Sequence, residues 1–323
     1  MQLPPAPLFD TVAGGPPGGR AVWAECADGV RIRVGAWHPQ GQVRGTVLLF
    51  PGRTEYIEKY GRAATVMAGH GFAMLAIDWR GQGLADRLTE DRRIGHVLRF
   101  TDYQQDVAAV LQAAEALGLP RPWHLLGHSM GGGIGLRAAM DGMVVQSCVF
   151  TGPMWGIYMS PLMRPMGWTL AYAGPAVGMG LRLPPSTRYE SYVTALPFEG
   201  NTLTTDRTMY ERMRLQLERH PELGLGGPSL VWLREALAEC RALAQRPSPA
   251  LPCLTILGAR EKIVDCDAVR ARMRAWPMGE LDIVHGAEHE VMMETPAIRR
   301  HVFDRMVALF DAAALAPPAA RSA

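Results

Sequence analysis

Short apolar runs alternate with helical patterns along most of this chain, and that alternation restricts its possible folds more than any other feature. Each run ends at a glycine-marked turn, and the runs of the first half are "GTVLLFPG", "FAMLAIDWRGQG", "PWHLLGHSMGG" and "SCVFTGP". A clear helical pattern, "DYQQDVAAVLQAAEALG", separates two of them. Strands that alternate with helices form mostly parallel sheets with helices on both faces. The sequence therefore predicts one large α/β fold.

The alternation stops at Met154 and resumes after Pro249. Between these residues we find no buried-strand pattern, and the clearest helical stretches are "DRTMYERMRLQLERH" and "PSLVWLREALAECRALA". The strand pattern returns in "PCLTILGAREKIVD" and "GELDIVHGAEHE", and the long helical pattern "TPAIRRHVFDRMVALFDAA" follows. Because the last two strands need the earlier ones as partners, we interpret the interruption as an insertion between two strands of one sheet.

The expected organisation is a sheet-containing core with a helical lid. The core comprises residues 21–153 and 250–315, and the lid comprises residues 154–249. An N-terminal arm rich in proline and glycine, residues 1–20, precedes the core, and a C-terminal tail, residues 316–323, follows it. The alternation on both sides of Asp28 and Gly29 predicts a hairpin with a tight turn at the start of the core.

The composition argues against several classes of function. The formal net charge is +2 and no lysine-rich run occurs, so we expect no nucleic-acid partner. The five cysteines form no C-x-x-C pair, which indicates neither a disulfide framework nor a metal site, and no cofactor is expected. The N-terminal "MQLPPAPLFDTVAGG" lacks the features of a signal peptide, and no apolar stretch is long enough to cross a membrane. We expect a cytoplasmic protein.

Ser129 stands at the centre of a G-x-S-x-G pattern between the apolar run "WHLLG" and the helical pattern "GGGIGLRAAM". Such a strand–turn–helix exposes the serine hydroxyl on a sharp turn, where a neighbouring base can activate it. Small residues two positions before and after the serine allow the chain to bend that tightly. The pattern predicts that Ser129 is a catalytic nucleophile.

The partners of a nucleophilic serine on such a turn follow it in the order acid, then histidine. His285 and His289 both follow the last apolar strand, and we favour His289, which lies in the loop before the final helix. For the acid, Glu261 lies in the loop after "LTILG", whereas Asp265 comes four residues later and is explained more simply as a helix cap. Both acids remain open as the group that orients the imidazole.

An oxyanion hole needs two backbone N–H donors, one of them from the residue after the nucleophile. That residue is Met130, and we expect the second donor to be Arg53, in the loop "LLFPGRTEY". We also expect a helix to start beside Arg53, so that its dipole favours a developing anion. Asp78 and Arg80, at the end of a strand, are expected to tie loops together, and His96 is expected to be structural.

Several motifs together resemble the α/β-hydrolases of the bacterial lysophospholipase and monoacylglycerol lipase group. The similar segments are "GHSMGGG", "DWRGQGLADR", "GAREKIVD", "GAEHEVMMETPAIR", "GHVLRFTDYQQDV", "ALPF" and "GGPSLVWLREAL". The resemblance covers residues 20 to 312. It implies a serine hydrolase that cleaves the ester of a lysophospholipid or a monoacylglycerol. Two departures stand out: "PGR" lacks the usual histidine, and Glu261 stands where most relatives have aspartate.

The lid is rich in methionine and aromatic residues, which form adaptable apolar surfaces. They are Met154, Trp155, Tyr158, Met159, Met163, Met166, Trp168 and Met179. An apolar lid above a nucleophilic serine suits a single acyl chain, and Arg164 and Arg182 could meet a phosphate or an anionic membrane. Peripheral contact with the inner membrane through the lid is therefore an expectation.

Three other functions stay open on the same scaffold. A small-ester esterase needs no long acyl pocket. An aminopeptidase needs acidic lid residues that face the serine and hold an amine, for which Glu190, Glu199 and Glu211 are candidates. The fold could also serve as a catalytically inactive binding protein.

Overall fold

A nine-stranded sheet forms the centre of the protein, which is described by a computed structural model covering residues 3–185 and 187–315. The strand order is β1-β2-β3-β5-β4-β6-β7-β8-β9. The first pairs, up to β3 with β5, are antiparallel, and all the following pairs are parallel. The strands are β1 (Pro5–Ala6), β2 (Arg20–Glu25), β3 (Arg31–Trp37), β4 (Gly45–Phe50), β5 (Phe72–Asp78), β6 (Trp123–His128), β7 (Ser147–Thr151), β8 (Cys253–Gly258) and β9 (Gly279–Val284).

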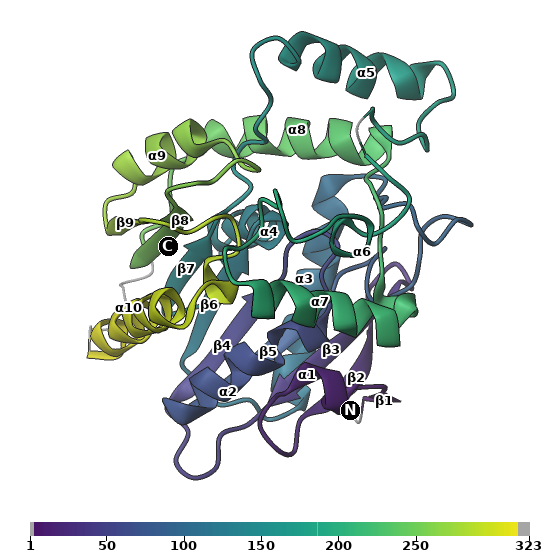
Figure 1. Cartoon of the computed structure of the whole chain (residues 1–323). Coiled ribbons are helices and arrows are strands. Elements are labelled where there is room, and N and C mark those ends of the chain that lie inside the picture. Colours follow the sequence, from purple (N-terminus) through teal and green to yellow (C-terminus); the bar gives the residue numbers. More distant parts are fainter. Residues whose placement is uncertain (1–2, 186, 316–323) are drawn as a thin grey trace.

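Helices cover both faces of this sheet (Figure 1). They are α1 (Asp10–Ala13), α2 (Gly61–Gly69), α3 (Tyr103–Ala116), α4 (Met130–Met140), α5 (Arg164–Ala176), α6 (Tyr192–Ala195), α7 (Arg207–Arg219), α8 (Leu230–Ala244), α9 (Cys266–Arg274) and α10 (Pro296–Leu315). Short 3₁₀ turns cover Ile57–Tyr60, Phe100–Asp102, Pro221–Leu223 and Val291–Met293. The predicted mostly parallel α/β fold is confirmed.

The central strand β4 shows how the sheet divides the core in two. Its side chains alternate between faces, as strand geometry requires. Leu48 and Phe50 are buried with residues of α3, α4, α8 and α9, whereas Val47 and Leu49 are buried with residues of α2 and α10. A parallel strand buried on both faces is apolar throughout, and this explains the continuous run in "TVLLF".

The chain between β7 and β8 contains α5 to α8 and, among its described residues, no strand of the sheet. Helix α8 packs partly on the core, where Trp232, Ala236 and Cys240 join the same buried cluster as α4. Helix α5 lies outside α8, at the top of Figure 1. The interrupted alternation in the sequence thus corresponds to a helical excursion from the sheet.

The N-terminal arm is packed against the rest of the protein rather than merely laid over its surface. Pro5 and Ala6 add β1 to the sheet edge, and Val12 and Ala13 are buried. Gln216, from α7, donates a hydrogen bond of 2.9 Å to the carbonyl of Val12. The expected C-terminal tail, residues 316–323, lies outside the described residues.

No helix in the described part of the chain combines the length and the apolar character that a membrane crossing requires. The expected hairpin is present: β2 and β3 pair antiparallel around a turn in which Gly29 has φ 81°. A positive φ of this size is easily adopted only by glycine, which explains the Asp-Gly sequence at the turn.

Candidate active site

Ser129 occupies a sharp turn between β6 and α4, with φ 50° and ψ −118°. A positive φ is unfavourable for a residue that carries a Cβ, and strain of this kind concentrates at functional sites. The turn is fixed on both sides. The N–H of Ser129 donates to the carbonyl of Thr151 at 3.0 Å, and the carbonyl of Ser129 accepts from the N–H of Met154 at 2.8 Å.

Glycines flank Ser129 because the neighbouring backbone comes too close for any side chain. A Cβ at Gly131 would lie 2.0 Å from the carbonyl oxygen of Phe50, and a Cβ at Gly127 would lie 2.9 Å from that of Gly131. These distances explain the G-x-S-x-G pattern physically. The first turn of α4 packs directly against the end of β4, and only glycine permits that approach.

His289 and Glu261 meet above the carboxyl ends of the last two strands, where Nδ1 of His289 is 2.6 Å from Oε2 of Glu261. The other oxygen of Glu261 accepts the backbone N–H groups of Ile263 at 2.7 Å and Val264 at 3.2 Å. Burial raises the pKa of Glu261, but the charge of His289 and these hydrogen bonds outweigh it, so the pKa lies below its ordinary value. An ionised, fixed carboxylate can hold the imidazole with its proton on Nδ1.

Asp265 and His285, the alternative acid and the alternative histidine, do not contact this pair. Asp265 is the N-cap of α9, and its carboxylate accepts the N–H groups of Asp267 at 3.0 Å and Ala268 at 3.2 Å. His285 is exposed at the end of β9. The geometry therefore brings together Glu261 and His289 and leaves Asp265 and His285 apart from this pair.

Gly152, just after β7, fixes the position of the imidazole. It has φ 48°, and a Cβ there would lie 3.0 Å from both Cε1 and Nδ1 of His289. The sequence analysis does not single out this glycine, although it lies in the quoted segment "SCVFTGP". Any side chain at this position would displace the ring from Glu261.

The loop that carries Arg53 approaches the nucleophile closely. A Cβ at Gly52 would lie 3.0 Å from the Cβ of Ser129. Gln82 donates to the carbonyl of Gly52 at 2.9 Å, and Thr54 has φ 67°, an unusual conformation for a β-branched residue. The two non-glycine residues with positive φ in the described chain, Thr54 and Ser129, thus both lie at this site.

The expected helix start beside Arg53 is wrong. The first helical residue is Ile57, in a 3₁₀ turn, and α2 begins only at Gly61. The conformation of Thr54 is incompatible with a helix, and the side chain of Glu55 accepts the N–H of Gly52. A helix dipole therefore does not act at Arg53, and any oxyanion stabilisation there rests on the backbone N–H groups of Arg53 and Met130.

A cavity of about 620 Å³ opens above Ser129. Ser129, Met130, Arg53 and His289 line it, together with residues from the segment between β7 and β8. Of the methionine and aromatic residues singled out in that segment, the ones that line the cavity are Met154, Tyr158, Met159, Met163 and Met166. The wall opposite the serine is therefore largely apolar.

Trp155, Trp168 and Met179 are not among the lining residues. Trp155 is buried in the core and donates to the carbonyl of Gly132 at 3.1 Å, and Trp168 stacks on Tyr172. Three of the eight expected apolar lid residues thus do not line the cavity.

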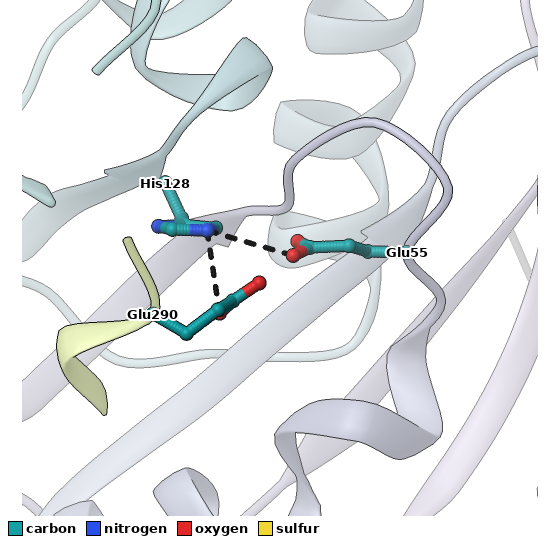
Figure 2. Close-up of side chains that lie close together, drawn as sticks. All are labelled: Glu55, His128 and Glu290. Carbon is teal, nitrogen blue, oxygen red and sulfur yellow. Dashed lines mark ion pairs between the residues drawn. The ribbon is translucent and has the colours of Figure 1, made fainter. Parts of the chain in front are cut away.

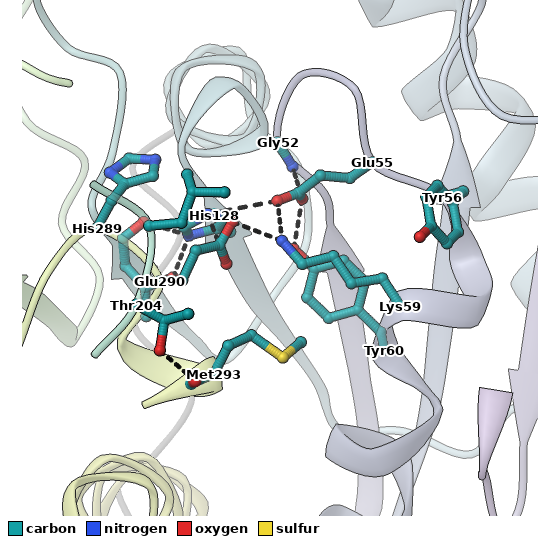
Figure 3. A network of polar contacts seen from close by, with 12 residues as sticks. Gly52, Glu55, Tyr56, Lys59, Tyr60, His128, Thr204, His289, Glu290 and Met293 are labelled. Carbon is teal, nitrogen blue, oxygen red and sulfur yellow. Dashed lines mark hydrogen bonds and ion pairs between the residues drawn. The ribbon is translucent and has the colours of Figure 1, made fainter. Parts of the chain in front are cut away.

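A buried network of charged side chains, shown in Figure 3, forms part of the wall of this cavity. The Nζ of Lys59 is 2.5 Å from a carboxylate oxygen of Glu55 and 2.5 Å from one of Glu290. The hydroxyl of Tyr60 donates to Glu55 at 2.5 Å, and His128 approaches both carboxylates (Figure 2). Each of the three segments of the candidate site contributes a member: Glu55 from the Arg53 loop, His128 next to Ser129, and Glu290 next to His289.

Both ring nitrogens of His128 face oxygen atoms. Its Nδ1 lies 3.0 Å from the carbonyl oxygen of Thr151, which can only accept. Its Nε2 lies 3.3 Å from Oε2 of Glu290 and 3.5 Å from Oε1 of Glu55. Burial alone would lower the pKa of His128, but the two carboxylates outweigh it and raise the pKa. Lys59 and His128 thus lie beside both buried carboxylates and are the groups that can balance their charge.

Glu55, His128 and Glu290 have ligand-type atoms within 4.8 Å of one another, a spacing that could suit a metal ion. The ammonium of Lys59 already contacts both carboxylates at 2.5 Å, so a positive charge stands where a metal ion would be held. The donor set therefore fits an internal ion cluster better than a cation site.

The network should contribute to stability in a pH-dependent way. Burial raises the pKa of Glu290, but the charges of Lys59 and His128 bring it well below its unfolded value of 4.5. A depressed carboxyl pKa contributes stability above the unfolded value, and this is lost as the pH falls through the folded value. We expect Glu290→Gln to lower the free energy of unfolding at pH 7 by about 3 kcal/mol, because it removes one of the two carboxylates that face Lys59 and His128.

Urea unfolding between pH 3 and 7 measures this effect. Below pH 4.5, the unfolding free energy of the wild type should fall more steeply than that of Glu290→Gln. The matched control is Glu280→Gln, which breaks the exposed pair with Arg305 and should change little. Equal stabilities of the two variants at pH 7 would contradict the proposed role of the network.

Other charged residues near the site hold loops, as expected. Asp78 accepts from Arg33 at 2.7 Å and from the N–H groups of Ile57 and Leu84 at 2.8 Å. Arg80 pairs with Asp106 at 2.7 Å and with Asp28 at 2.7 Å. The ring of His96 contacts the hydroxyl of Ser229, the N-cap residue of α8, at 2.8 Å.

Comparison with known proteins agrees with the fold and the motifs. Residues 41–296 match the family described as serine aminopeptidase, S33. The chain is 33% identical to lysophospholipase L2 of Escherichia coli strain K12, over 88% of this chain and 85% of that protein. It is 29% identical to the probable lysophospholipase L2 of Haemophilus influenzae, over 82% of this chain and 83% of that protein.

The structure resembles that of a soluble variant of monoglyceride lipase from Saccharomyces cerevisiae, with a TM-score of 0.70. The identity is 22%, and the match covers 90% of this chain and 94% of the other, so this likeness concerns the fold. Taken with the sequence relatives, these findings show that the chain belongs to the α/β-hydrolase family of bacterial lysophospholipases and monoacylglycerol lipases.

Proposed function

We propose that this protein is a serine hydrolase that cleaves the carboxylic ester of a single-acyl lipid, a lysophospholipid or a monoacylglycerol, through an acyl-enzyme intermediate. The observation that carries the proposal is the position of Ser129 and His289 on the wall of one largely apolar cavity. The relatives named as lysophospholipases and the neighbour named as a monoglyceride lipase support the same substrate class.

In the proposed mechanism, the hydroxyl oxygen of Ser129 attacks the ester carbonyl while His289 takes the hydroxyl proton. Glu261 stabilises the imidazolium, and the backbone N–H groups of Arg53 and Met130 stabilise the oxyanion. His289 then returns the proton to the departing glycerol oxygen, which leaves an acyl ester on Ser129. Water, activated by His289, attacks that ester and releases the fatty acid and the free hydroxyl of Ser129.

The segment between β7 and β8 supports the choice of a lipid. Met159, Met163 and Met166 line the cavity, and unbranched methionine side chains adapt to a flexible acyl chain. A volume of about 620 Å³ lies within the range of pockets that enclose small ligands and exceeds the need of a short ester. We propose that residues 154–249 act as the lid over the site.

The alternative functions receive less support. Glu190, Glu199 and Glu211 are exposed and do not line the cavity, and the last two pair with Arg207. Within the described residues, the acids that line the cavity are Glu55 and Glu290, and both already contact Lys59 and lie beside His128. A site for a free amine, as an aminopeptidase requires, is therefore not supported.

A peripheral contact with the inner membrane through the lid is part of the proposal. Residues 154–189 contain arginines at 164, 182 and 188 and no acidic residue, and their exposed apolar side chains include Leu162 at 88% and Val177 at 69%. Apolar side chains with cationic neighbours favour an anionic lipid surface. The free thiols at all five cysteines fit a cytoplasmic location. Flotation with phosphatidylglycerol vesicles, compared with phosphatidylcholine vesicles, measures the contact, and equal recovery would contradict it.

Hydrolysis rates on a substrate series test the proposed activity. We expect kcat/KM to rise with acyl length along p-nitrophenyl esters, and lysophospholipids and monoacylglycerols to be turned over with release of fatty acid. Amino-acid p-nitroanilides should not be cleaved. A protein that cleaves only acetyl esters, or only the anilides, would replace the lipid assignment with one of the alternatives.

A further inference from the structure

The guanidinium of Arg53 lies beside the candidate active site without an acidic partner. Its Nη1 donates to the carbonyl of Gly226 at 2.8 Å, and its Cζ lies 5.7 Å from the centre of a Trp232 ring. No other acceptor contacts the guanidinium within the described residues, so most of its N–H groups stay available. Burial lowers the pKa of Arg53 to about 10, which leaves the side chain charged at neutral pH.

The other permanently cationic residue on the cavity wall, Lys59, has acidic partners. Among the described residues that line the cavity, Lys59 contacts both Glu55 and Glu290 at 2.5 Å and is neutralised there. Arg53 instead presents an uncompensated charge to a largely apolar cavity. A partly buried cation without a counterion is costly, and an anionic ligand would remove that cost.

Two loops, residues 93–96 and 226–229, surround the side chain of Arg53 and fix its orientation. The backbone of Gly95 pairs with Gly227 and Ser229, with hydrogen bonds of 2.9 and 2.8 Å. A Cβ at Gly95 would lie 3.5 Å from Nη1 of Arg53. Pro228, in the second of these loops, and Trp232, shortly after it, line the same cavity as Ser129. The guanidinium is thus held at the cavity wall by a carbonyl and an indole, and neither neutralises its charge.

The reach of the side chain matches the spacing of two groups in a lysophospholipid. In the proposed mechanism, the backbone N–H of Arg53 binds the oxyanion that forms on the ester carbonyl. From that nitrogen to Cζ the side chain spans about six covalent bonds. The path from the ester carbonyl carbon to the phosphorus of a 1-acyl lysophospholipid also spans about six bonds. The two groups of Arg53 and the two groups of the substrate are therefore separated by the same number of bonds, so one residue has the reach to contact both.

We infer that the Arg53 guanidinium binds the phosphodiester of a lysophospholipid and makes the enzyme prefer such substrates over monoacylglycerols. The inference rests on the proposed ester hydrolysis and specifies its substrate class. A planar guanidinium donates paired hydrogen bonds to phosphate oxygens, which a glycerol hydroxyl cannot match in charge. The phosphodiester itself stays intact, because only the carboxylic ester is cleaved.

Selectivity between two substrates tests the inference. Lysophosphatidylglycerol and monoacylglycerol with the same short acyl chain are compared below their aggregation concentrations, with wild type, Arg53→Lys and Arg53→Met. The ratio of the two kcat/KM values should fall about tenfold to a hundredfold in Arg53→Met, and less in Arg53→Lys, which keeps the charge. The matched control is Arg92→Met, an exposed arginine near the loop that frames Arg53, which should leave the ratio unchanged.

The ratio separates the possible outcomes. A wild type that hydrolyses neither lipid would refute the proposed function. Hydrolysis of both lipids, with a ratio unaffected by Arg53→Met, would leave that function standing and overturn the inference. Equal losses of kcat/KM on both substrates would overturn it too, because they would indicate that the Arg53 side chain only stabilises its loop.

A second measurement uses the wild type alone and does not depend on the folding of a variant. sn-Glycerol 3-phosphate should inhibit p-nitrophenyl ester hydrolysis competitively, at a concentration at least about tenfold lower than glycerol. Equal inhibition by the two compounds would contradict a phosphate subsite in the cavity.

Discussion

Ser129→Ala should lower kcat by about 10⁴-fold or more while leaving the fold intact, because it removes the proposed nucleophile. Alanine keeps a Cβ and therefore keeps the backbone strain of φ 50° at this position. We thus expect a thermal midpoint close to that of the wild type. Ester hydrolysis and thermal unfolding of the same preparation measure both effects.

A glycine variant at the same position separates strain from catalysis. Ser129→Gly should be equally inactive but more stable, by about 1 kcal/mol, since glycine adopts a positive φ without strain. Retention of more than about a tenth of the activity by either variant would show that another residue is the nucleophile.

The second large effect concerns the acid. Glu261→Gln should lower kcat by up to about 10⁴-fold, because an amide cannot stabilise the imidazolium and favours the wrong tautomer of His289. Asp265→Asn should instead lower stability by about 1 kcal/mol or less, as expected for a helix cap, and keep most of the activity. Determining kcat and thermal midpoint for both variants distinguishes the two roles.

Two further variants serve as controls for this assignment. Glu261→Asp should also be impaired, because its shorter side chain would withdraw the carboxylate that now lies 2.6 Å from Nδ1 of His289. His289→Ala should be nearly as inactive as Ser129→Ala. His285→Ala, at an exposed position, should keep the activity. Loss of catalysis in Asp265→Asn at unchanged stability, with an active Glu261→Gln, would assign the acid to Asp265.

The sequence predicts the fold and the segment around Ser129 well because both depend on local patterns. Apolar runs separated by helical patterns specify a parallel sheet, and the glycines at 127 and 131 reflect close backbone contacts that no other residue allows. The loop positions of Glu261 and His289 can also be predicted from the sequence, since each loop follows a strand. Spacing alone leaves the choice between Glu261 and Asp265 open, because both follow the same strand.

The buried network was not predictable from the sequence. Lys59 and Glu290 are 231 residues apart, and no local pattern indicates that they meet. The segment "TEYIEKY" contains Glu55, Glu58 and Lys59 and is predicted to begin a helix. Tertiary contacts decide otherwise: Glu55 binds the backbone of Gly52, and Thr54 takes a conformation that ends any helix there.

The surroundings of the Arg53 side chain were likewise not predictable from the sequence. The sequence predicts its backbone N–H as an oxyanion donor, but the surroundings of its side chain depend on loops 93–96 and 226–229, which are distant in sequence. Whether a charged side chain finds a counterion is a property of the folded chain. The sequence supplies the residue types, and the packing of these loops determines the environment.

Labelling with a fluorophosphonate tests the central claim most directly, because this reagent reacts with an activated serine in proportion to its nucleophilicity. Intact mass and peptide mass spectrometry of the wild type should show one adduct, on the peptide that carries Ser129. Ser129→Ala should show none, and His289→Ala should react far more slowly than the wild type. An adduct on another residue, or no adduct on a wild type that still hydrolyses esters, would contradict the assignment of Ser129 as the nucleophile.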